Sequence, residues 1–70
     1  MSQAFAVVIE PAGDNFSAYV PDLPGCVASA ATREAVLAEI QAAIQLHLQG
    51  MAADACPPPQ AQTSVATVVA

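Results

Sequence analysis

The feature that most constrains this chain is a proline-rich turn between two apolar runs, at residues 19–26 (Tyr-Val-Pro-Asp-Leu-Pro-Gly-Cys). Pro21 and Pro24 fix φ and each lacks a backbone donor, so no regular strand or helix can pass through the segment. Pro24-Gly25 has the order that suits the centre of a type II turn, where Gly25 takes a positive φ. An aspartate such as Asp22 often hydrogen-bonds the backbone two residues further on. The sequence therefore predicts a rigid, ordered turn here.

Two interpretations of this turn are open. It can simply join two strands, or it can present side chains to a partner, because ordered loops on a scaffold often carry function. On the second interpretation, the turn presents above all Tyr19, Asp22 and Leu23. The candidate partner-binding residues are then Tyr19, Pro21, Asp22, Leu23, Pro24 and Gly25.

Three strands are predicted around the turn. Residues 4–10 are apolar except for Glu10, are rich in β-branched side chains and are followed by Pro11, which predicts a strand. The nearly continuous hydrophobicity suggests a central strand covered on both faces. Residues 12–15 have turn chemistry, so residues 16–20 form the second strand of a hairpin. Residues 26–29 predict a short third strand, whose brevity is typical of an edge.

A helix follows, with Thr32 as the expected N-cap. Residues 33–49 contain no proline or glycine and many strong helix formers, and Gly50 fits the position just past a helix end. One apolar face is expected to pack on the sheet, because these residues recur at helical spacing: Val36, Leu37, Ile40, Ala43, Ile44, Leu48 and Met51.

The rest of the chain predicts a loop and a final strand. The three prolines at residues 57–59 favour a polyproline II spacer within a loop at residues 52–62. Residues 63–69 are rich in threonine and valine and predict a fourth strand. The order β-β-β-α-β indicates an α+β fold, a two-layer sandwich.

The turn, followed by Thr32-Arg33-Glu34 and by residues 44–48 (Ile-Gln-Leu-His-Leu), resembles the HicB family. These proteins are the antitoxins of HicA–HicB toxin–antitoxin pairs and their short stand-alone relatives. The resemblance runs from about residue 5 to residue 50, and its Y-x-P-D-L-P-G-C block is specific. The family usually has Glu-Ala at Ala35-Val36, a departure that costs one surface charge on the helix.

The resemblance implies a partial RNase H-like sheet, with the last strand beside the first. It also implies a protein without enzymatic activity that binds a small basic HicA-like toxin, an mRNA-cleaving RNase, and blocks its active site. Many full-length HicB antitoxins continue into a DNA-binding domain. This sequence stops at Ala70, so we expect a single HicB-like domain over residues 1–70 without a C-terminal DNA-binding domain.

The charge supports a protein partner and argues against nucleic acid. One arginine and no lysine stand against six carboxylates, giving a formal charge of −5. Direct nucleic-acid binding depends on Lys and Arg, whereas an acidic surface favours association with a basic partner. A stand-alone self-associating module without a toxin is the alternative function. A small-molecule or nucleic-acid binder is a weaker third.

Catalytic, metal and cofactor sites are not expected. Two-metal hydrolysis needs converging carboxylates, but Glu34 and Glu39 are five residues apart and share no tight helical face. Two cysteines make no disulfide framework, and C-x-x-C is absent. Cys26 is expected to be a small buried hydrophobe. His47 is expected to flank the apolar helix face with a structural hydrogen bond or, alternatively, to contact a partner.

Self-association is expected whichever function holds. A 70-residue chain buries only about 60% of its unfolded surface, and a core of Ala and Val buries little area per side chain. Edge strands can pair between chains, and a dimer or a tetramer of two dimers would close the assembly. We expect no signal peptide and no membrane span, and a cytoplasmic protein.

Overall fold

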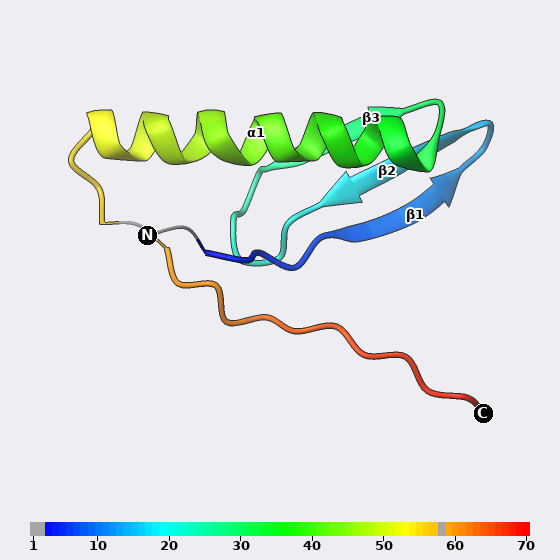
Figure 1. Ribbon diagram of the computed structural model, residues 1–70. Coiled ribbons are helices and arrows are strands. Elements are labelled where there is room, and N and C mark those ends of the chain that lie inside the picture. Colours follow the sequence, from blue (N-terminus) through cyan, green and yellow to red (C-terminus); the bar gives the residue numbers. More distant parts are fainter. Residues whose placement is uncertain (1–2, 58) are drawn as a thin grey trace.

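The computed structural model describes residues 3–57 and 59–70, and shows a sheet with one long helix lying across it (Figure 1). The elements are β1 (Val8–Ala12), β2 (Asn15–Tyr19), β3 (Val27–Ala30) and α1 (Arg33–Ala53). The strands form an antiparallel sheet in the order β1-β2-β3. The predicted α+β class is confirmed. The first strand is an edge strand, however, and β2 is the central one, so the prediction of a central first strand is wrong.

The β1–β2 hairpin explains this difference. Its register runs from Val8 opposite Tyr19 to Ala12 opposite Asn15, and Gly13 takes a φ of +65° in the turn. Pro11 lies inside β1 instead of ending it. A proline lacks the donor that a second neighbour would need, so it is tolerated on an edge strand.

Helix α1 begins where the sequence predicts. The Thr32 hydroxyl accepts a hydrogen bond from the Ala35 N–H at 3.0 Å, which confirms the N-cap. The helix does not end before Gly50 but continues to Ala53. Since a glycine inside a helix costs only about 1 kcal/mol, the alanines that follow can carry the helix past it.

The C-terminal end of α1 is a Schellman motif. The Cys56 N–H donates to the Met51 carbonyl at 2.9 Å, and the Ala55 N–H donates to the Ala52 carbonyl at 3.1 Å. Ala55 takes the left-handed conformation with a φ of 59°. The position that usually holds glycine is therefore occupied by an alanine.

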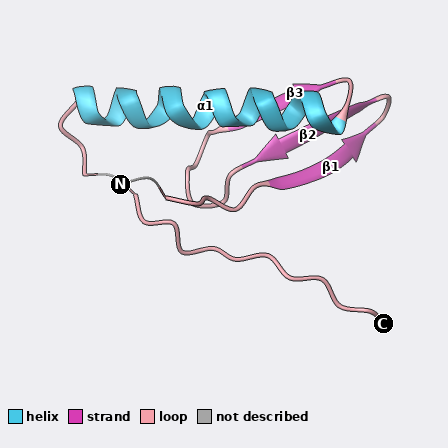
Figure 2. Ribbon diagram, viewed as in Figure 1, coloured by secondary structure: helices cyan, strands magenta, loops and turns pink. Residues whose placement is uncertain are grey.

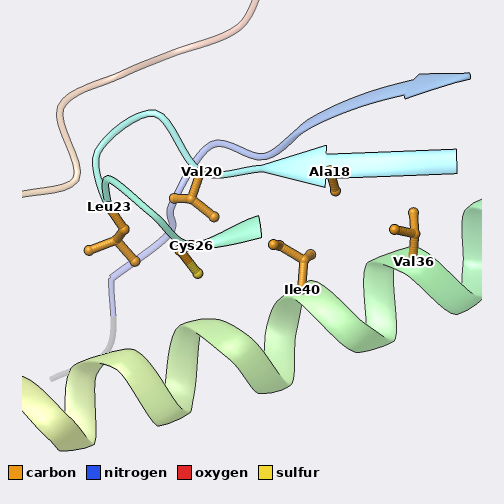
Figure 3. Close-up of a cluster of buried hydrophobic side chains, with 6 residues drawn as sticks. All are labelled: Ala18, Val20, Leu23, Cys26, Val36 and Ile40. Carbon is orange, nitrogen blue, oxygen red and sulfur yellow. The ribbon is translucent and has the colours of Figure 1, made fainter. Parts of the chain in front are cut away.

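The core lies between α1 and the sheet, and α1 packs mainly on β2 and β3. Figure 3 shows the buried side chains, which are Ala18, Val20, Leu23, Cys26, Val36 and Ile40. Three of the six come from the turn after β2 and two from α1. The rest of the apolar helix face is only partly covered: Ile44 and Leu48 are half-buried, and Leu37 is 36% exposed.

The predicted fourth strand is not formed within the described chain. Residues 59–70 are not assigned to any strand, and they run on the side of the sheet away from α1 (Figures 1 and 2). A strand needs a neighbour for its backbone groups, and no described segment of the same chain lies beside residues 63–69 as a strand. The predicted polyproline spacer includes Pro58, which lies outside the described residues.

Candidate functional site

The candidate site is the turn that joins β2 to β3, and it consists of two successive β-turns. The Leu23 N–H donates to the Val20 carbonyl at 3.0 Å, and the Cys26 N–H donates to the Leu23 carbonyl at 3.0 Å. The Val20 N–H closes the loop on the Cys26 carbonyl at 3.2 Å. Gly25 has a φ of +85°, which confirms the positive φ predicted for the second turn.

Every third residue of this turn points into the core. The side chains of Val20, Leu23 and Cys26 are 2%, 1% and 4% exposed, and they face α1 (Figure 3). The turn is therefore part of the core. The prediction that Leu23 is presented at the surface is wrong, because two stacked turns repeat with a period of three and bring it inside.

The other predicted residues of the turn remain accessible. Tyr19 is 43% exposed, and Pro21, Pro24 and Gly25 are exposed. The proline rings and the tyrosine form a stiff surface, since φ is fixed at both prolines and the loop is closed by its own backbone hydrogen bonds. Whether this surface binds a partner stays a prediction.

Asp22 contacts the C-terminal segment instead of its own turn. Its carboxylate accepts hydrogen bonds from the Thr63 N–H at 2.9 Å, the Thr63 hydroxyl at 2.8 Å and the Gln62 N–H at 3.1 Å. The Thr63 backbone and hydroxyl donors, with the Gln62 N–H, hold the pKa of Asp22 below its ordinary value. Asp22 thus fixes the point at which the C-terminal segment leaves the domain.

Gln3 makes a second attachment nearby. Its amide donates to the Pro59 carbonyl at 2.9 Å and accepts from the Ala61 N–H at 2.8 Å. Together, Gln3 and Asp22 hold residues 59–63 against the domain at both ends of this stretch.

A shallow hollow adjoins the turn, between β3 and the second half of α1. Its volume is about 210 Å³, and its lining residues are Gly25, Cys26, Val27, Ala43, Leu46 and His47. Val27 and Leu46 are 65% and 71% exposed. Sequence reasoning missed both; the available signal was Leu46, a large apolar residue that lies off the predicted packing face of the helix.

Cys26 and His47 both border this hollow. Burial raises the pKa of the Cys26 thiol, which keeps it protonated, and the prediction of a buried cysteine is confirmed. His47 is half-buried beside Leu46. It flanks the apolar helix face, and its alternative role as a partner contact stays a prediction.

Within residues 3–57 and 59–70, no three His, Cys, Asp or Glu side chains are close enough to hold a metal ion. Five of the six carboxylates are exposed, at Glu10, Asp14, Glu34, Glu39 and Asp54. Within the part of the chain that the structure describes, no helix has both the length and the apolar character needed to cross a membrane.

Fold and site together define a small, acidic α+β domain with an ordered turn beside an apolar hollow. A family model described as "HicB_like antitoxin of bacterial toxin-antitoxin system" matches residues 5–70. Because the match covers nearly the whole chain, the protein belongs to this family, and the resemblance carried by the turn is confirmed. The match also extends through residues 51–70. No curated protein and no solved structure matches the chain.

Proposed function

We propose that this protein is an antitoxin that binds a small basic HicA-type mRNA-cleaving toxin and blocks its active site. Membership of the antitoxin family is the observation that carries the proposal. A formal charge of −5 with a single arginine supports it, since an RNA-cleaving protein needs a basic surface and complementary charge accelerates and selects association. Its place of action would be the cytoplasm, where mRNA is found.

The contact surface we propose is the exposed part of the turn together with the hollow. Val27 and Leu46 are exposed apolar side chains that line the hollow together with Gly25 of the turn. Apolar anchors at the centre of a contact and charges at its rim are typical of protein interfaces. Asp22 is occupied by Gln62 and Thr63 and Leu23 is buried, so their contribution is to hold the surface in shape.

A second candidate function is a self-associating module without a toxin partner. The observation that favours it is the exposed C-terminal segment, whose Val68 and Val69 are 93% and 103% exposed. Self-association is compatible with both functions, and toxin binding distinguishes them.

The test is a binding titration with a purified small basic HicA-type toxin, using two matched variants. Leu46→Glu places a charge in the hollow, whereas Gln49→Glu adds the same charge to an exposed part of α1 that does not line the hollow. We expect Leu46→Glu to weaken binding at least tenfold, roughly the effect of losing one buried leucine, and Gln49→Glu to bind like the wild type. Equal binding by both variants would reject the hollow as the contact, and no binding by the wild type would reject the antitoxin function.

A further inference from the structure

A larger groove lies on the opposite flank of α1 from the hollow. It has a volume of about 800 Å³ and separates the helix from the N-terminal segment that leads into β1. Its apolar lining includes Phe5, Val7, Leu37, Ile44, Leu48 and Met51. The described residues that line it include no Asp, Glu, Lys or Arg. In a chain of charge −5, such an uncharged groove suits an uncharged apolar occupant.

Residues 63–70, here termed the C-terminal arm, have this chemistry. The arm contains no charged side chain, and its valines at 65, 68 and 69 are 64%, 93% and 103% exposed. With this exposed arm, the chain as a whole is less compact than a globular monomer of its size. Its accessible surface of 5165 Å² exceeds the roughly 4,100 Å² expected for a compact monomer of 7.1 kDa. Its radius of gyration of 13.1 Å likewise exceeds the expected value of about 11 Å.

The arm cannot fill the groove of its own chain without losing its attachments. Asp22 and Gln3 hold residues 59–63, and from there the arm runs on the side of the sheet opposite α1 (Figures 1 and 3). The groove lies against α1, so the strands and the N-terminal segment stand between the two.

We propose that the C-terminal arm of one copy lies in the groove of a second copy, as a strand added along the outer edge of β1. In the described chain β1 pairs only with β2, so its outer edge before Pro11, next to the groove, can accept a strand. Side chains alternate in a strand, which would place Val65 and Val69 over the groove and Val68 on the open face. Reciprocal exchange keeps the attachments at Asp22 and Gln3 intact.

The area is sufficient for a stable dimer. Each copy exposes about 1,000 Å² more than a compact monomer of its size. Burying this excess on both copies gives a total of about 2,000 Å², at the upper end of a standard specific interface. This inference is independent of toxin binding, because the hollow and the groove lie on opposite flanks of α1.

The first test uses two variants of the arm in the full chain. Val65→Asp charges the face that we place in the groove, and Val68→Asp puts the same charge on the open face. Both lie outside the core, so circular dichroism should show the wild-type fold. By sedimentation equilibrium we expect a wild-type dimer, at least tenfold weaker dimerisation for Val65→Asp, and an unchanged dimer for Val68→Asp. A monomeric wild type, or equal effects of both variants, would overturn the proposal.

The second test separates exchange between copies from any other dimer. Met51→Glu charges the groove at a half-buried position outside the core and leaves the arm intact, whereas Val65→Asp does the reverse. Each variant alone should dimerise poorly, but a mixture retains one intact arm and one intact groove. We expect mixed dimers by native mass spectrometry, in excess of either homodimer. A mixture that behaves as the average of its components would overturn the proposal.

Discussion

Asp22 is the residue whose role changes most between sequence and structure. In the sequence it is a turn aspartate and a candidate partner contact, whereas in the structure its carboxylate receives three hydrogen bonds from Gln62 and Thr63. Those donors lie 40 and 41 residues away in sequence. No local pattern could identify them, because the contact forms only once the helix and the segment after it are in place.

The first prediction is a pH dependence of the attachment at Asp22. The pKa of Asp22 is lowered in the folded chain, so the attachment is present above the ordinary aspartate pKa of about 4 and is lost as pH falls through the lowered value. The Thr63 amide resonance should therefore titrate with an apparent pKa below the ordinary value.

Asp22→Asn is the control for this prediction. It removes the carboxylate without changing the size of the side chain, and should abolish the titration of the Thr63 amide while leaving the core resonances in place. A Thr63 amide that shows no change down to a pH of about 2 would contradict the hydrogen bonds to Asp22.

At the scale of elements, the helix shows what a sequence pattern can and cannot locate. Its start was predictable, because Thr32 caps the helix through a contact only three residues away. Its end was not predictable. Glycine is the residue type that usually follows a helix end, but Gly50 lies inside α1, and the left-handed conformation that follows the end of α1 is at Ala55. The strands were predictable to within a few residues, but the inward direction of Leu23 depends on two linked turns and the position of residues 63–69 depends on a neighbouring strand.

The second prediction is that Gly50→Ala stabilises the protein. Gly50 lies inside α1 and is exposed, and an added methyl group would meet no atom within 4 Å. We expect an increase of about 0.5–1 kcal/mol in the free energy of unfolding, measured by urea denaturation at a fixed protomer concentration. Gly13→Ala is the matched control: its methyl group has equal space, but its φ of +65° makes the substitution destabilising. Destabilisation by Gly50→Ala would show that the helix ends before this residue.

The third prediction concerns Ala55, which occupies the position after the helix end that usually holds glycine. Ala55→Gly relieves the left-handed conformation at the helix end, where the φ of Ala55 is 59°. Because this conformation costs an L-residue about 1 kcal/mol or more, the free energy of unfolding should rise by about 1 kcal/mol. Ala53→Gly, two residues earlier and inside the helix, should lower it. A loss of stability for both substitutions, or a gain for Ala53→Gly, would contradict the Schellman motif.

At the scale of the whole molecule, α1 separates two kinds of surface. The hollow beside β3 joins the exposed part of the turn, and the groove beside the N-terminal segment is uncharged and mainly apolar. The helix is 21 residues long, and the buried core reaches only Val36 and Ile40 on it. The second half of its apolar face is only partly covered, and both associations that we propose use this half of the helix.

The fourth prediction is that salt weakens toxin binding but does not weaken dimerisation. Toxin binding brings together opposite charges, so it should weaken as salt screens them. Dimerisation brings together two chains of charge −5 through uncharged surfaces, so salt should leave it unchanged or strengthen it. Both can be measured by sedimentation at low and high salt. A dimer that dissociates as salt rises would contradict an uncharged arm-in-groove contact.

The most direct test of the central claim is an RNA-cleavage assay with a purified small basic HicA-type toxin. If the protein is an antitoxin that blocks the active site, cleavage should fall in proportion to added protein and stop at a fixed stoichiometry. Leu46→Glu should need a larger excess, whereas Val65→Asp should still inhibit because its charge lies on the arm. Undiminished cleavage in the presence of excess wild-type protein would contradict the antitoxin function.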